Sequence, residues 1–169
     1  YNAKGVMVAK DVADLHGPAG VPDARFALTA REATIRLASG RSVAALTFDG
    51  RSPGPELRVR QRDLVEVTLE NEDIEQGVTI HWHGVDVPNA EDGVAGVTQD
   101  AVEEGEEYTY RFVADQVGTY WYHSHQVSHV QVRRGLLGPL VVHPREPLPQ
   151  DVDEVVLAHT YSGTRTLNG

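Results

Sequence analysis

The sequence of 169 residues contains no cysteine, which excludes disulfides, thiolate metal sites and cysteine nucleophiles within this chain. It also lacks an apolar run long enough to cross a bilayer, and it shows no signal-peptide pattern. Basic residues are outnumbered, since 15 Lys and Arg face 25 Asp and Glu, which gives a formal net charge of −10. A chain with this balance has little with which to neutralise phosphates, so we expect no nucleic-acid partner.

Long helical periodicity is also missing, because no stretch of more than about ten residues keeps the spacing of a helix. Short alternating runs of β-branched and apolar residues are instead separated by Gly- and Pro-rich turns. In one run Val65, Val67 and Leu69 share a face. This texture predicts an all-β sandwich or barrel. We expect one short helix, at residues 126–135.

Composition divides the chain into four parts. Residues 1–24 are rich in Gly, Pro, Ala and Asp and predict an irregular lead-in. Residues 25–143 carry the strand-like runs of one β domain, and residues 144–151 are Pro-rich and polar, as in an inter-domain linker. We interpret residues 152–169 as the truncated start of a second domain.

Two strand-like stretches each carry a His-x-His pair. These are "TIHWHG", residues 79–84, and "YWYHSHQ", residues 120–126. On a strand, residues two apart point to the same face and lie roughly 7 Å apart at the backbone. His81 and His83 should therefore project together while Trp82 points into the core, and His123 and His125 should pair in the same way.

Four imidazoles brought together predict a metal site. A single His-x-His pair is equally well explained by two hydrogen-bonded surface histidines, but burying two pairs without a metal would leave polar nitrogens in need of partners. Imidazole-only ligand sets suit copper, zinc, iron or nickel and disfavour calcium and magnesium. The spacing alone does not choose among these four metals.

Several quoted stretches together resemble one known family. "HWHG" and "GTYWYHSHQ", followed by "RRGLLGPLVV", resemble the first cupredoxin domain of the laccase-like multicopper oxidases. The stretch "TFDGRSPGPELRVRQRDLVEVTLEN" is similar to the opening strands of that domain, and the resemblance runs from about Phe26 to His143. It implies a cupredoxin-like Greek-key β-sandwich or barrel for residues 25–143. It also implies that residues 152–169 begin the next cupredoxin domain.

The resemblance implies a copper enzyme in which a reducing substrate gives up electrons singly and dioxygen is reduced to water at a trinuclear cluster. Matched motif to motif, His81 would bind the type 2 copper. His83 and His123 would share one type 3 copper, and His125 would bind the other. The "EDG" stretch resembles an acidic loop near the cluster, so Asp92 would assist proton delivery. A loop-tip aspartate before a turn glycine is the plainer interpretation of Asp92.

One departure from the family pattern limits this chain. A type 1 copper needs a thiolate, so that centre must lie outside these residues, and the chain supplies half of the cluster's imidazoles. A downstream domain, or a neighbouring subunit of a homotrimer, would complete the cluster. The family also implies an extracytoplasmic location. Two alternatives are a non-catalytic cupredoxin module for copper binding or protein interaction, and a zinc enzyme.

Overall fold

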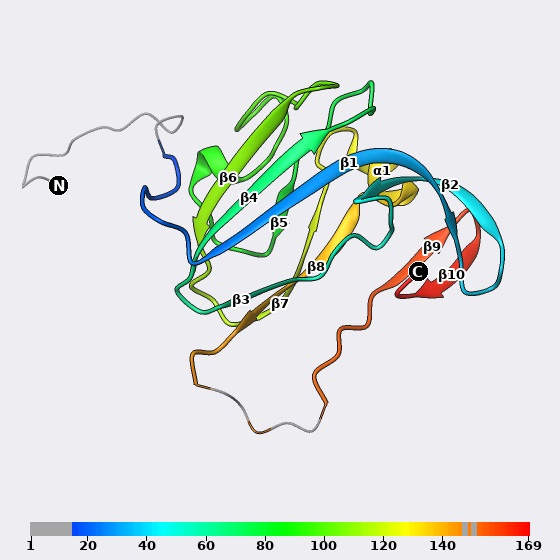
Figure 1. Ribbon diagram of the computed structural model, residues 1–169. Helices are drawn as coiled ribbons and strands as arrows, with labels where there is room; N and C mark the ends of the chain where they lie inside the picture. Colours follow the sequence, from blue (N-terminus) through cyan, green and yellow to red (C-terminus); the bar gives the residue numbers. More distant parts are fainter. Residues whose placement is uncertain (1–14, 147–148, 150–151) are drawn as a thin grey trace, which may run out of the picture.

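A computed structural model describes residues 15–146, 149 and 152–169 of the chain (Figure 1). Most of the predicted lead-in, together with residues 147–148 and 150–151 of the predicted linker, lies outside the described residues. The described part is built mainly of strands, with one short α-helix. None of its helices is long and apolar enough to span a membrane.

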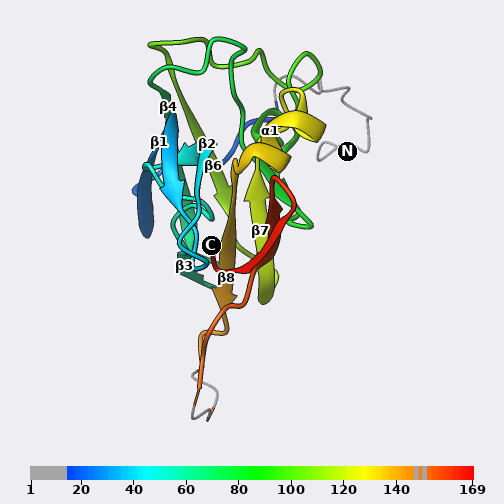
Figure 2. The same ribbon diagram turned by 90° about the vertical axis from the view of Figure 1, so that its right-hand side faces the viewer.

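Two four-stranded sheets pack face to face. The first contains, in spatial order, β2 (Ser42–Phe48), β1 (Ala24–Arg36), β4 (Leu64–Asn71) and β6 (Glu107–Val113). The second contains β3 (Leu57–Arg60), β8 (Leu137–His143), β7 (Gly118–His123) and β5 (His81–His83). Figure 2 shows the two sheets nearly edge-on. The pairs β1–β4 and β3–β8 are parallel, and the other neighbours are antiparallel. The predicted all-β sandwich is confirmed.

The core lies between the inner faces of the two sheets. On β4 the predicted alternation is confirmed, because Val65, Val67 and Leu69 are fully buried while the residues between them are more exposed. The second sheet contributes Trp82, whose ring lies 4.8 Å from that of Phe112 on β6. Fully burying each such side chain contributes about 1.5–3 kcal/mol, so these contacts hold β5 firmly against the first sheet.

The remaining elements lie at the edges of the sandwich. Helix α1 (Ser128–Arg134) confirms the predicted short helix, and the 3-10 helix η2 (Asn89–Glu91) lies in the long connection after β5. Strands β9 (Ala158–Tyr161) and β10 (Thr164–Leu167) form a hairpin beside the β1–β2 end (Figure 1). Tyr161 is buried there, and its hydroxyl lies 2.6 Å from that of Ser52. That residues 152–169 begin a second domain stays a prediction.

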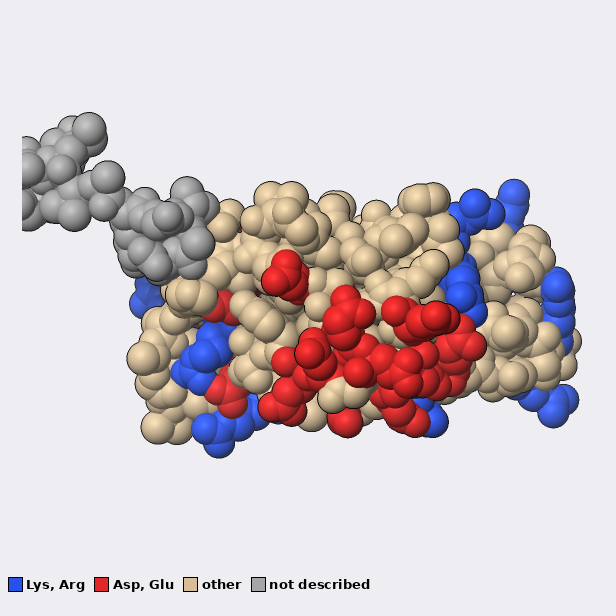
Figure 3. Space-filling model, turned by 90° about the horizontal axis from the view of Figure 1, so that it is seen from above, with Lys and Arg blue, Asp and Glu red and all other residues tan. Residues whose placement is uncertain are grey.

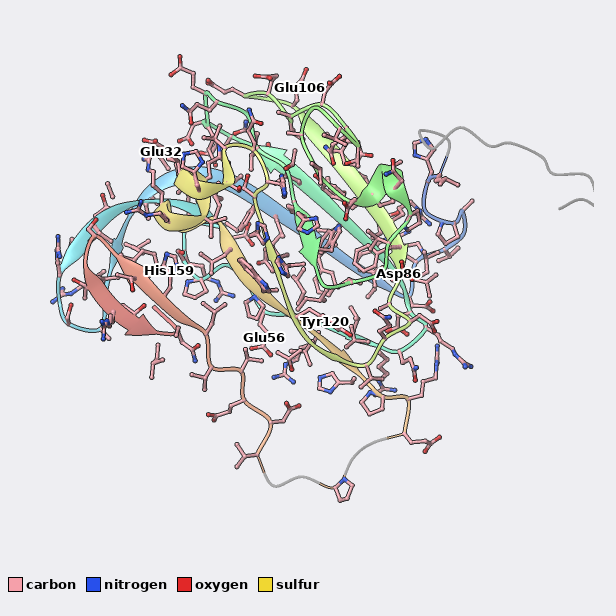
Figure 4. All side chains as sticks on the ribbon, turned by 180° about the vertical axis from the view of Figure 1, so that it is seen from behind. Glu32, Glu56, Asp86, Glu106, Tyr120 and His159 are labelled. Atoms are coloured by element: carbon pink, nitrogen blue, oxygen red, sulfur yellow. The ribbon has the colours of Figure 1, made fainter. Side chains whose placement is uncertain are left out.

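Charge is distributed unevenly over the surface. Figure 3 shows Asp and Glu gathered in the middle of the face seen from above, with Lys and Arg toward its two ends. The acidic stretch before β6 is exposed, as expected for a solvated loop, and Glu106 stands at its outer tip (Figure 4). The acidic residues therefore lie in solvent.

Candidate metal centre

Strand pairing between β5 and β7 brings the two histidine pairs together. The strands are antiparallel, with His81 opposite His123 and Trp82 opposite Tyr122. Trp82 and Tyr122 are fully buried and point into the core. Since side chains alternate along a strand, His81, His83 and His123 stand on the outer face of the second sheet. A histidine from each sequence stretch therefore shares one site.

All four predicted ligands lie in one cluster of rings. The centroid of His81 lies 5.8 Å from that of His83, 5.3 Å from His123 and 5.3 Å from His125. The remaining close pairs are His83–His123 at 5.5 Å and His123–His125 at 6.3 Å. The structure thus brings together the four side chains that the sequence pattern singled out, although their role as ligands stays a prediction.

The ring nitrogens fit a bound metal ion best at three of the four residues. One nitrogen from each of His81, His83 and His123 lies within 4.8 Å of the other two. His83 Nδ1 and His123 Nε2 are 3.2 Å apart. Imidazole nitrogen binds Zn at about 2.0–2.1 Å, so two nitrogens at this separation can share one ion of similar size. His125 lies outside this group of three, beside His81.

Backbone carbonyls fix the tautomers of two of the rings. His81 Nδ1 lies 2.8 Å from the carbonyl oxygen of Asp92, and His123 Nδ1 lies 2.9 Å from that of Ser124. A carbonyl only accepts hydrogen bonds, so both Nδ1 atoms carry the proton and both Nε2 atoms present a lone pair. The lone pair of His123 Nε2 accepts a hydrogen bond from His83 Nδ1 at 3.2 Å. Outer partners of this kind orient metal-binding imidazoles and raise their basicity.

Burial keeps the ring at the centre of the cluster neutral. His123 is only 6% exposed, and this burial lowers its pKa to about 4, against the opposing hydrogen bond to the Ser124 carbonyl. The three neighbouring imidazoles contribute a smaller part of this lowering, because a second positive charge nearby is unfavourable. A metal binds the deprotonated imidazole, so His123 is ready to act as a ligand near neutral pH.

Asp92 lies at the edge of the cluster, as the resemblance implied. Its carboxylate Oδ1 is 3.3 Å from His81 Nδ1, and its side chain is about one-third exposed, at 34%. Sequence reasoning missed the closer contact, which is made by its backbone carbonyl. Gly93 permits this approach, because it has a φ of 71° and an added Cβ would lie 1.8 Å from the carbonyl oxygen of Ile80. Gly93 is therefore needed for the loop to pack against the start of β5.

The second pair departs from the expected strand geometry. His123 ends β7, and His125 lies beyond it, in the turn before α1.

The turn that carries His125 is held by polar groups that sequence reasoning missed. Ser124 Oγ donates to Gln131 Oε1 at 2.5 Å, and Gln131 Nε2 donates to the carbonyl of Gly77 at 2.9 Å. His125 N donates to Thr79 Oγ1 at 3.2 Å. No sequence signal separates the buried Gln131 from other polar residues of its helix.

Trp121 forms a wall of the site that sequence reasoning also missed. Its ring stacks on His83 with centroids 4.8 Å apart and a 29° interplanar angle. It also lies 4.1 Å from the ring of His123. Trp121 precedes His123 by two residues on β7, so strand alternation was a signal that could have found it. The contact restricts the motion of the two rings whose nitrogens are closest.

Comparison with known proteins gives one family. The family described as multicopper oxidase matches residues 29–147. The chain is 40% identical over 132 residues to a copper resistance protein A homolog of Pseudomonas syringae pv. tomato, covering 78% of this chain and 22% of that protein. It is 46% identical over 102 residues to an L-ascorbate oxidase of Cucumis sativus, covering 59% and 17%. The chain thus spans only about a fifth of the length of these relatives.

Solved structures agree with this match. A multi-copper oxidase from Pseudomonas thermotolerans superposes with a TM-score of 0.78 at 37% identity, covering 83% of this chain and 34% of that one. A blue copper oxidase from Nitrosomonas europaea gives a TM-score of 0.76 at 31% identity, covering 86% and 53%. Both likenesses extend over most of the sandwich described above.

Proposed function

The chain belongs to the multicopper oxidase family, and from this premise we propose that it carries half of a copper cluster at which the full-length protein reduces dioxygen. Copper is the cofactor of the family. The observation that carries the proposal is the convergence of His81, His83 and His123, each with one nitrogen within 4.8 Å of the others. Copper tolerates imidazole ligands in both of its common oxidation states, so such a site permits redox cycling.

The distances support an assignment of each of the four imidazoles to a particular copper ion. His83 and His123 would share one type 3 copper, because their facing nitrogens are 3.2 Å apart. His81 would bind the type 2 copper through Nε2, since its Nδ1 is engaged by the Asp92 carbonyl. His125 would bind the second type 3 copper. When bound, copper supplies the electron transfer and dioxygen chemistry, while these rings fix the positions of the ions.

Asp92 is the proposed proton-delivering group of this site. Its carboxylate lies 3.3 Å from a ring nitrogen of His81 and is one-third exposed, at 34%, so it touches both the cluster and the solvent. A carboxylate in this position can take protons from water and pass them to reduced oxygen. Its neighbour Glu91 does not suit this role, because it is only 4% exposed.

Other parts of the full-length protein must complete the centre. The chain has no cysteine for a type 1 copper, so electrons from the reducing substrate would enter elsewhere. The histidines stand on the outer face of a sheet whose edge strand, β5, leaves His83 exposed. A downstream cupredoxin domain, or a neighbouring subunit in a homotrimer, would cover this face and add the missing ligands. We place the enzyme outside the cytoplasm, as the family resemblance implies.

Oxygen consumption by the copper-loaded full-length protein, with a phenol as electron donor, tests the proposal. His123→Asn should lower both copper content and oxygen consumption, the latter by at least about 100-fold, because losing a ligand costs more than losing its hydrogen-bond partner. His129→Asn is the matched control, since His129 is exposed on α1. Full activity in His123→Asn would refute the proposal. Copper binding without oxygen consumption in the unsubstituted protein would favour the non-catalytic copper-binding module.

A further inference from the structure

The two adjacent carboxylates of the "EDG" stretch face in different directions. Asp92 faces the histidine cluster, whereas Glu91 is buried at 4% exposure and faces β6. Glu91 Oε1 accepts the backbone N–H of Gly17 at 2.8 Å, and Oε2 accepts the backbone N–H of Arg111 at 2.9 Å. A buried carboxylate is costly unless hydrogen bonds compensate it, and both oxygens of Glu91 are compensated.

These two hydrogen bonds connect three segments that are far apart in the sequence. Gly17 precedes the sandwich by several residues and lies so close to β6 that an added Cβ would be 1.7 Å from the carbonyl oxygen of Arg111. The Arg111 guanidinium donates to the carbonyls of Pro18 at 3.2 Å and Gly20 at 2.7 Å. The segment of residues 17–20 is thus fixed along β6, and the Glu91 carboxylate bridges this segment and β6.

The 3-10 helix η2 is held at other points as well. Ala90 N donates to the carbonyl of Leu15 at 3.1 Å, and the hydroxyl of Tyr108 donates to the carbonyl of Ala90 at 2.9 Å. Glu91 is the last residue of η2, which is held by Leu15 on one side and by Tyr108 of β6 on the other. The next carbonyl along the chain, that of Asp92, accepts the Nδ1 proton of His81 at 2.8 Å.

We propose that Glu91 is a positioning residue of the metal centre. By joining η2 to β6 and to the segment around Gly17, it sets the place of the Asp92 carbonyl, and this carbonyl fixes the tautomer and orientation of His81. Asp92 directly follows Glu91, and the peptide bond that joins them is planar. Anchoring Glu91 therefore leaves the Asp92 carbonyl little freedom to move. The inference rests on the proposed function, in which His81 binds copper.

The test uses electron paramagnetic resonance of Cu(II) in the full-length protein, with chelator competition to measure affinity. His81→Asn identifies the part of the signal that depends on His81. Glu91→Gln keeps the side-chain shape but places an amide N–H against a backbone N–H donor, so η2 should shift. We expect a roughly ten-fold loss of affinity for that copper and a changed hyperfine splitting, at the low end of the 10- to 100-fold effect of disturbing an outer partner.

Two further variants make the outcome decisive. Glu107→Gln removes the same charge from an exposed position on β6 and should leave the copper signal unchanged. Gly17→Ala keeps every charge but forces its segment away from β6, so it should change the signal in the same direction as Glu91→Gln, and it carries the test if Glu91→Gln does not fold. Wild-type affinity and hyperfine splitting in folded Glu91→Gln or Gly17→Ala would overturn the inference. An unchanged signal in His81→Asn would instead refute the proposed role of His81.

Discussion

The two His-x-His pairs have the same spacing in the sequence but are held in place by different means. His81 and His83 both lie in β5, and a loop carbonyl from Asp92 approaches the first of them. His123 ends β7, and His125 lies in a turn supported by a buried glutamine of α1. The first pair is thus placed by regular strand geometry, and the second by a polar network around a turn. Equal spacing in a sequence does not require equal local structure.

Because the two supports share no residues, each can be disturbed separately. A change in the loop after η2 should affect the His81 side of the cluster, and a change in α1 should affect the His125 side. The following predictions use this separation, from the largest expected effect to the smallest.

Gly93→Ala should be the most damaging change to the first support. The added Cβ would lie 1.8 Å from a backbone oxygen, at a φ of 71°. Backbone strain and overpacking together should cost roughly 3–5 kcal/mol of the free energy of unfolding, measured by urea denaturation of the metal-free protein. Gly96→Ala is the control, because Gly96 has a φ of 75° but nothing within 4 Å of an added Cβ. Equal losses in the two variants would show that the contact with β5 is unimportant.

Gln131→Leu should disturb the second support. It would leave the buried Ser124 O–H without an acceptor and the buried Gly77 carbonyl without a donor, although Ser124 Oγ still accepts the backbone N–H of Gln126. The cost should be about 2–4 kcal/mol in the free energy of unfolding. Gln126→Leu removes only an exposed hydrogen bond and should change stability by less than about 0.5 kcal/mol. Copper content should fall in Gln131→Leu through His125. Retention of both stability and copper would contradict the role given to this network.

The smallest effect is a pH dependence that belongs to His123. Burial lowers the pKa of His123 to about 4 in the folded state, so below the unfolded value of about 6.5 the unfolded chain binds more protons. The stability is therefore complete above pH 6.5 and is lost as the pH falls toward 4. Between pH 7.5 and 5 the loss should be roughly 2 kcal/mol for the metal-free protein. The free energy of unfolding of His123→Gln should fall by that much less than that of the unsubstituted protein over the same pH range. Parallel curves of stability against pH for the two proteins would refute the assignment of this pH dependence to His123.

Much of the fold could be predicted because side-chain burial follows a period of two. The alternation in residues 65–70 and the first pair of histidines each indicated the correct face of a strand, whereas in the second pair only His123 lies in one. The strand lengths could not be predicted equally well. Residues 79–84 suggested one strand, but β5 contains only residues 81–83, and shortly before it Val78 pairs in an isolated bridge with Val102.

The parts of the site that the sequence did not reveal are backbone groups and long-range contacts. The carbonyl of Asp92 has no side-chain signature, and its position depends on how closely Gly93 approaches β5. The lead-in was expected to be irregular, which says nothing about its hydrogen bond to Glu91, 74 residues later. Such contacts exist only once the sheets have formed, so periodicity and composition carry no trace of them.

Three of the four imidazoles stand on one side of the second sheet, and the apolar interior lies on the other. Folding and metal chemistry therefore draw on opposite surfaces of the same strands. A related protein without the histidines would keep its fold. Other metal-binding side chains could be introduced at positions 81 and 83 without changes to the core.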